Sequence, residues 1–185
     1  MNETSHLLAS TFVTGSVAGV VSTAALAAFA KAEGKRAPQP TNATSHWLQG
    51  QEAGKIDRVD LEHTAVGFAT HQASALFWAL PFEAWLGSHP PRSNMELLRN
   101  AAVVSAIAAA VDYGVTPKRL TPGWELTLSK HSIVGAFVSL AVGLVAGALL
   151  ARQVLPRSSA EIREDPAEFR GQARELLTPE QASRT

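Results

Sequence analysis

Residues 131–151 have the sequence HSIVGAFVSLAVGLVAGALLA, which contains no Lys, Arg, Asp or Glu. A helix on the surface of a soluble protein needs one wet face and therefore carries charge every turn or two. A helix that is apolar on all sides for about 20 residues is long enough to cross about 30 Å of hydrocarbon. This stretch therefore predicts a transmembrane helix, and it decides the fold class.

Two other stretches share this lack of charge. Residues 4–30 and residues 63–82 are 27 and 20 residues long, and neither contains Lys, Arg, Asp or Glu. A further apolar segment is weaker, because Arg99 and Asp112 bracket only 12 uncharged residues. The sequence predicts an all-α integral membrane bundle of four transmembrane helices, formed by residues 1–155. We place the spans at about residues 7–30, 62–85, 96–115 and 128–151.

The two ends of the chain differ in character. Residues 1–10 contain no Lys or Arg, and the apolar run that follows exceeds the length of a typical signal-peptide core, so we expect it to remain as the first span. Residues 156–185 form a polar tail. Asp165 and Pro166 are a favourable helix start, which predicts either a short amphipathic helix on the membrane surface or a solvated tail.

Composition excludes several classes of function. The 16 basic residues balance the 16 acidic ones, so there is no electrostatic basis for binding nucleic acid. The chain contains no cysteine, which excludes disulfide bonds, thiolate metal sites and cysteine nucleophiles. Residues 42–44 match the acceptor triplet for N-glycosylation, a common pattern that nothing else in the sequence supports. The lipid bilayer is the expected partner.

Orientation depends on the distribution of Lys and Arg. Eight of these residues fall in the first and third loops and eight on the other side of the membrane. The first span often dominates, and it has no Lys or Arg before it but is followed by Lys31, Lys35 and Arg36. This pattern favours a cytoplasmic location for the first and third loops, with both termini outside.

Small residues recur at intervals of four in the spans. Two Gly-x-x-x-Gly pairs are present, Gly15 with Gly19 and Gly143 with Gly147, and Gly135 extends the second series. Because lipid tails are as apolar as leucine, membrane helices associate where small residues let their backbones approach closely. The pattern predicts a tightly packed bundle, or alternatively a homodimer formed through one of these faces.

The four-span topology brings polar residues to the face of the first and third loops, at the ends of three spans. His71 lies about 12 Å deeper in the second span, eight residues beyond the histidine that begins it. The candidate cluster is His46, His63, His71, Asp112, Glu125 and His131. A second polar group, which includes Glu83 and Arg99, belongs to the opposite rim.

Four chemical interpretations of this cluster remain open. Ionisable residues inside spans are costly and usually face the bundle interior, where they can tie helix ends together or form a proton or ion path. Converging histidines and a carboxylate could also bind a metal, and His71 with His131 could hold a haem iron. No diagnostic ligand spacing such as His-x-x-x-His occurs, so no cofactor is predicted.

Three stretches resemble those of uncharacterised small multi-pass proteins of bacterial genomes. They are residues 45–50 (SHWLQG), residues 63–71 (HTAVGFATH) and residues 112–125 (DYGVTPKRLTPGWE). The resemblance would cover roughly residues 10–150. It implies four spans in a bacterial inner membrane, and it brings neither an activity nor assigned site residues.

The expected function is that of a structural or accessory membrane protein. One alternative is a small proton- or ion-linked transporter that acts as a dimer, since four spans rarely enclose a pathway alone. The other is a membrane protein that binds a metal or haem. No nucleophile paired with a base and no cofactor motif is evident, which argues against an enzyme.

Overall fold

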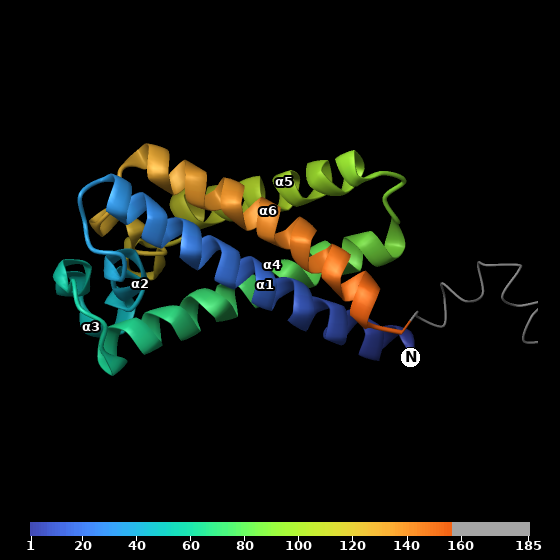
Figure 1. Cartoon of the computed structure of the whole chain (residues 1–185), viewed down its shortest axis with the longest axis horizontal. Coiled ribbons are helices and arrows are strands. Elements are labelled where there is room, and N and C mark those ends of the chain that lie inside the picture. The colour runs from blue at the N-terminus through green and yellow to red at the C-terminus, as the bar shows by residue number, and fades with distance from the viewer. Residues whose placement is uncertain (157–185) are drawn as a thin grey trace, which may run out of the picture.

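The computed structural model describes residues 1–156, and these residues form helices and no strands. The tail helix that the sequence suggested lies outside the described residues. Four long helices run lengthwise through the molecule (Figure 1). They are α1 (Glu3–Ala32), α4 (Val66–Ser88), α5 (Asn94–Ala110) and α6 (Lys130–Val154). The predicted all-α class is confirmed for the part of the chain that is described.

Capping side chains fix where three of these helices begin. Asn2 accepts a hydrogen bond from the Ser5 backbone N–H at the start of α1, at 2.7 Å. Ser93 and Ser129 act in the same way at the starts of α5 and α6. The first backbone N–H groups of a helix have no partner within it, so such caps stabilise a helix start by about 1 kcal/mol each.

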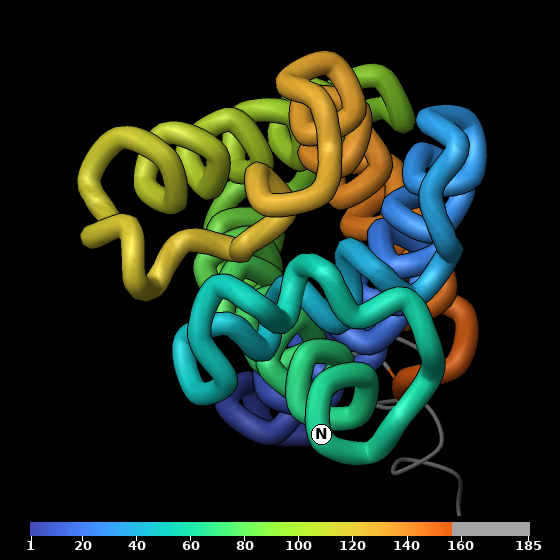
Figure 2. Tube along the Cα trace, turned by 90° about the vertical axis from the view of Figure 1, so that its left-hand side faces the viewer, coloured from blue at the N-terminus to red at the C-terminus, as the bar shows by residue number. Residues whose placement is uncertain are grey.

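Both ends of the bundle have a distinct structure. The segments between α1 and α4 and between α5 and α6 gather at one end, which we call the cap (Figures 1 and 2). The N-terminus, the turn between α4 and α5 and the end of α6 lie at the other end. The cap contains α2 (Gln39–Ala43), α3 (His46–Gln49), η1 (Gln51–Lys55), η4 (Lys118–Leu120) and η5 (Trp124–Leu126).

Two π-helical turns join the cap to the bundle. One, η2 (Leu61–Ala65), leads into α4, and the other, η3 (Val111–Val115), continues α5 beyond Ala110. Such turns are rare and occur frequently at functional sites. Both the first turn of the second predicted span and the last turn of the third therefore depart from α-helical geometry.

The helices pack around α1, which contacts both α4 and α6, while α5 packs mainly on α6. Glycines make the closest approaches: a Cβ on Gly143 or Gly147 of α6 would lie 2.6 Å from the Cα atom of Ala18 or Thr14 of α1, respectively. Gly135 of α6 faces the ring of Phe29 in α1.

The glycine pair of α1 packs against a different helix. A Cβ on Gly15 would lie 2.7 Å from the Cα of Leu76 in α4, and one on Gly19 would overlap the side chain of Gln72. Both predicted glycine pairs thus make their close contacts within the chain. The glycine faces of α1 and α6 are therefore occupied by helices of the same chain.

Three helices of the described chain are long and apolar enough to cross a membrane by length and composition. They are Glu3–Ala32, Asn94–Val115 and Lys130–Val154. The fourth helix, α4, is not among them although it has 23 residues, since His71, Gln72 and Glu83 lower its hydropathy. The third predicted span, which the sequence marked as the weakest, is thus apolar enough to cross a membrane. The second predicted span is the one that falls below this level.

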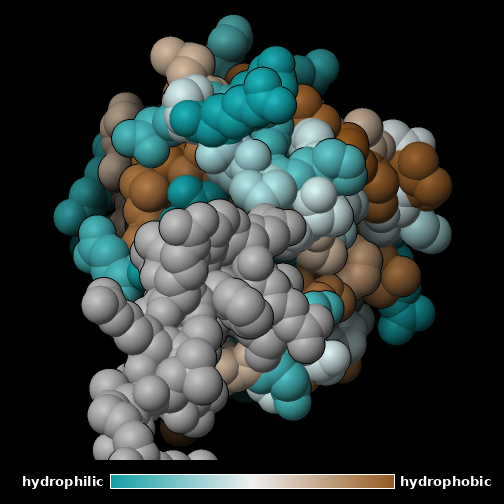
Figure 3. Space-filling model, turned by 90° about the vertical axis from the view of Figure 1, so that its right-hand side faces the viewer, coloured by the Kyte–Doolittle hydropathy of each residue, from teal (hydrophilic) through white to brown (hydrophobic). Residues whose placement is uncertain are grey.

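Large apolar side chains are exposed along the bundle. Phe12 and Val20 on α1, Ile107 on α5, and Val134 and Val138 on α6 all face outward. Seen from the end opposite the cap, hydrophobic residues also appear on the flanks of the molecule beside the hydrophilic ones of its end (Figure 3). Exposed apolar side chains along the length of a bundle fit contact with a membrane or another protein.

Candidate functional site

A cavity of about 280 Å³ lies where the cap meets the bundle. Its walls come from α4, from α6, from the π-helical turn after α5 and from the cap. His71 and Asp112, both members of the candidate cluster, line this cavity together. Four aromatic side chains also line it: Trp47, Trp78, Trp124 and Phe137.

Trp124 is held in the cavity wall by a hydrogen bond and two ring contacts. It is buried, and its indole N–H donates to the Thr44 hydroxyl at 3.2 Å, which uses its single polar group. Its ring meets the edge of His71 at a centroid distance of 5.6 Å and lies 5.5 Å from that of Phe137. A residue of the third loop is therefore locked between α4, α6 and the first loop.

A second tryptophan joins the first loop to α4. The indole N–H of Trp47 donates to the Thr70 hydroxyl at 3.3 Å, and both residues line the cavity. Trp78 lies two turns further along α4, where its ring meets that of Phe77 edge to face. Trp47 and Trp124 thus each have a specific hydrogen-bond partner in the cavity wall.

His71 is 7% exposed and is anchored to α1. Its Nε2 lies 2.8 Å from the Ser22 hydroxyl oxygen, and that hydroxyl lies 2.7 Å from the Ala18 carbonyl oxygen. Because a hydroxyl has one proton and the carbonyl can only accept, Ser22 donates to Ala18 and accepts from His71. His71 therefore donates its Nε2–H to Ser22 of α1.

Asp112 lies in η3 and is half-buried against the cavity. Among the described residues, none forms an ion pair or hydrogen bond with its carboxylate. His131 and Lys130 are exposed at the start of α6. A half-buried carboxylate without a partner is energetically unfavourable. We therefore expect Asp112 to contact a ligand or solvent in the cavity.

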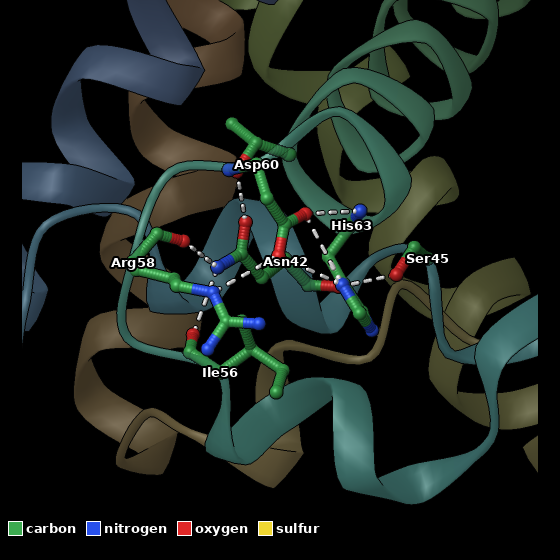
Figure 4. Close-up of polar contacts among 7 residues, drawn as sticks. Asn42, Ser45, Ile56, Arg58, Asp60 and His63 are labelled. Atoms are coloured by element: carbon green, nitrogen blue, oxygen red, sulfur yellow. Dashed lines mark hydrogen bonds and ion pairs between the residues drawn. The ribbon is translucent and has the colours of Figure 1, made fainter.

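The cap is held together by Asn42, which is fully buried (Figure 4). Its amide nitrogen donates to the carbonyl oxygens of Ile56 and Arg58 at 2.8 and 2.9 Å. Its amide oxygen accepts from the Thr64 hydroxyl at 2.6 Å, and its carbonyl accepts from Ser45. With every polar group engaged inside the protein, Asn42 is not accessible as a glycosylation acceptor in the folded chain.

His63 belongs to the cap network and not to the cavity. Its Nδ1 lies 3.1 Å from the Asp60 carboxylate, and its backbone N–H donates to the same carboxylate at 2.7 Å (Figure 4). The backbone hydrogen bond from His63 is the main reason why the pKa of Asp60 lies below its usual range. This pair caps the entry to α4.

The other members of the predicted cluster are separated from the cavity. His46 is buried beside the Ala43 carbonyl oxygen, 3.1 Å from its Nδ1. Glu125 accepts hydrogen bonds from Tyr113 and Thr121 at the exposed rim of the cap. No group of three or more His, Asp or Glu residues that could hold a metal ion is present in the described part of the chain.

The two residues of the predicted opposite rim do not meet. Glu83 accepts a hydrogen bond from Thr14 at 2.6 Å, which ties α4 to α1 inside the bundle. Arg99 is exposed and lies 3.5 Å from Glu96 on its own helix. The rim therefore contains an interhelical tie and a separate surface ion pair.

Glu33 is a site that the sequence analysis missed. It accepts from the Ser129 backbone N–H at 3.1 Å and from the Ser132 hydroxyl at 2.6 Å, joining the end of α1 to the start of α6. The Ser132 hydrogen bond is the largest cause that lowers the pKa of Glu33 to about 2. The only available signal was a carboxylate after an apolar run and a Ser-x-x-Ser motif before another.

No family model, no curated protein and no solved structure matches the chain. The cavity and its chemistry are therefore the basis for any assignment of function.

Proposed function

We propose that this chain is an integral membrane protein with four spans, and that its capped end holds a binding site for a small molecule. The cavity lined by His71, Asp112 and four aromatic rings carries this proposal. Ligand sites are concave, mostly apolar and equipped with a few convergent polar groups, and their volumes begin at about 300 Å³. The resemblance to small bacterial multi-pass proteins supports a bacterial inner membrane as its location.

The packing of α4 supports its role as the fourth span. Its 23 residues extend over about 34 Å, which is enough to cross the hydrocarbon. Its polar side chains turn inward, where His71 meets Ser22 and Glu83 meets Thr14. Phe77 and Leu80 face outward. A span may carry polar groups when they face the bundle interior, so its low hydropathy does not exclude α4.

Cysteine labelling tests the four spans, because the native chain contains no cysteine. Asp57→Cys lies in the cap and Arg92→Cys lies in the turn between α4 and α5, and both positions are exposed. A maleimide that cannot cross membranes should label these two positions from opposite sides of oriented vesicles. Labelling of both from the same side would show that α4 does not cross.

Fluorine NMR of protein labelled with fluorotryptophan in mild detergent tests the binding site. The chain has four tryptophans, of which Trp47, Trp78 and Trp124 line the cavity. The fourth, Trp85, lies near the other end of α4 and serves as an internal control. A panel of small amines, carboxylates, sugars and neutral amides should include a compound that shifts the three cavity signals saturably and leaves Trp85 unchanged. If no compound does so, the binding function is wrong.

A structural or accessory membrane protein is the second candidate. It is favoured by two ties between α1 and α4, His71 with Ser22 and Glu83 with Thr14, which need no ligand. On this interpretation, polar residues only fix how helices pack. It predicts that no compound of the panel shifts the cavity tryptophans, although His71→Leu lowers the melting temperature.

A further inference from the structure

We propose that the cavity at the capped end binds a small organic cation, namely an alkylated or quaternary ammonium compound of about the size of choline. This inference rests on the proposed binding function and specifies its ligand. It is carried by the combination of aromatic walls with the Asp112 carboxylate, which pairs with none of residues 1–156, at the same cavity.

The aromatic walls come from separate parts of the chain. Trp124 and Trp47 are contributed by the two cap segments, Trp78 by α4 and Phe137 by α6. The indole N–H groups of Trp47 and Trp124 are already donated to Thr70 and Thr44, so neither indole keeps a free donor for a ligand. Aromatic faces attract alkylammonium groups through the ring quadrupole, and cages of such rings are how proteins recognise choline-like groups.

The charges at the cavity also favour a cationic ligand. Asp112 is its one carboxylate, and none of the described residues that line it is Lys or Arg. An anionic ligand would be repelled by Asp112, and a purely apolar ligand would bury this carboxylate unpaired. A cationic ligand neutralises it. The Nε2–H of His71 is donated to Ser22 of α1.

The same arrangement disfavours an inorganic cation. A hard metal ion needs about six oxygen ligands, and a transition metal prefers several histidines or carboxylates. The cavity offers one carboxylate, and no metal-binding group of three is present among residues 1–156. A weakly hydrated organic cation needs no such ligand set, because methyl groups pack against the rings.

The test compares choline with its uncharged isostere, in which a quaternary carbon replaces the nitrogen. Binding to the full-length protein in detergent is followed by the fluorine signals of Trp47, Trp78 and Trp124. We expect choline to bind saturably and at least about tenfold more tightly than the isostere. Asp112→Asn should weaken choline binding by about tenfold or more, and the matched variant Asp57→Asn, at an exposed cap position, should not change it.

Folding of the Asp112→Asn variant is checked by its helical circular dichroism and melting temperature, which should not fall, since no residue of the described chain is hydrogen-bonded or ion-paired to the carboxylate. Trp124→Phe keeps a ring but weakens the cation–π attraction, and it provides a second variant. Equal binding of choline and the isostere, or full binding by Asp112→Asn, overturns the cationic ligand. A carboxylate or sugar that alone shifts the tryptophans also overturns it, but leaves the binding site standing. If no compound shifts them, both proposals fail.

Discussion

The two flanks of the bundle are built in opposite ways. Where α6 meets α1, glycines bring the backbones into direct contact and leave no space, as at Gly143 against Ala18. Where α4 faces α5 and α6 near the cap, large aromatic residues hold the helices apart and enclose a cavity. The comparison suggests a division of roles: the glycine seam supplies rigidity, and the aromatic flank supplies space for a ligand.

The largest effect is expected from breaking the glycine seam. Gly147→Leu would drive its side chain into the backbone of Thr14, which cannot shift without separating α1 from α6. Overpacking of this kind costs up to about 3 kcal/mol in the free energy of unfolding, and more where backbone is displaced. Thermal unfolding of the protein in detergent measures this loss of stability.

The matched control is Ala146→Leu, one residue away on the exposed face of α6. It should leave the melting temperature nearly unchanged, because its side chain points away from α1. Equal destabilisation by both variants would show that the seam does not carry the stability of the bundle.

A second prediction concerns the junction between the cap and α4. A Cβ on Gly67 would overlap the carbonyl oxygen of Thr41 in α2, so Gly67→Ala must push the cap away from α4. We expect a loss of about 2 kcal/mol in the free energy of unfolding and altered fluorine signals of Trp47 and Trp124. Hydrogen exchange of the cap amides would show where the protein opens.

Gly87→Ala is the control on the same helix. No atom lies within 4 Å of a Cβ at this position, and alanine favours a helix over glycine by about 0.5–1 kcal/mol. The same Gly→Ala change should therefore lower the free energy of unfolding at position 67 and raise it at position 87. A stabilised Gly67→Ala variant would mean that the cap does not pack against α4 as described.

A third prediction removes the centre of the cap network. Asn42→Ala leaves the carbonyl oxygens of Ile56 and Arg58 without their donor, which costs about 1–3 kcal/mol in the free energy of unfolding. The exposed Asn94 at the start of α5 provides the control substitution, and its change to alanine should cost little. If the two variants have the same melting temperature, the buried amide of Asn42 does not stabilise the cap.

The sequence predicted the helical class and the small-residue pattern because both follow from local rules, a charge-free run and a repeat of four. It could not predict the roles of Asn42 or Glu33. The partners that give them these roles lie 14 to 99 residues away, in loops and at the starts of helices. The same limit applies to the candidate cluster. The predicted topology placed its six residues at one end of the bundle. Only the packing of the loops decides that His71 and Asp112 share a cavity while His63 contacts Asp60.

The smallest effect concerns the link between α1 and α6 at the cap. Glu33→Gln weakens the hydrogen bonds to Ser129 and Ser132, and we expect a loss of about 1 kcal/mol in the free energy of unfolding at pH 7. The pKa of Glu33 is about 2 in the folded protein and 4.5 in its reference state. Because folding lowers this pKa, the stabilisation is complete above about pH 4.5 and is lost as the pH falls towards 2. The difference in melting temperature between the native protein and Glu33→Gln should therefore shrink across this range. A constant difference for Glu33→Gln over this range would mean that the charge of Glu33 does not stabilise the link between α1 and α6.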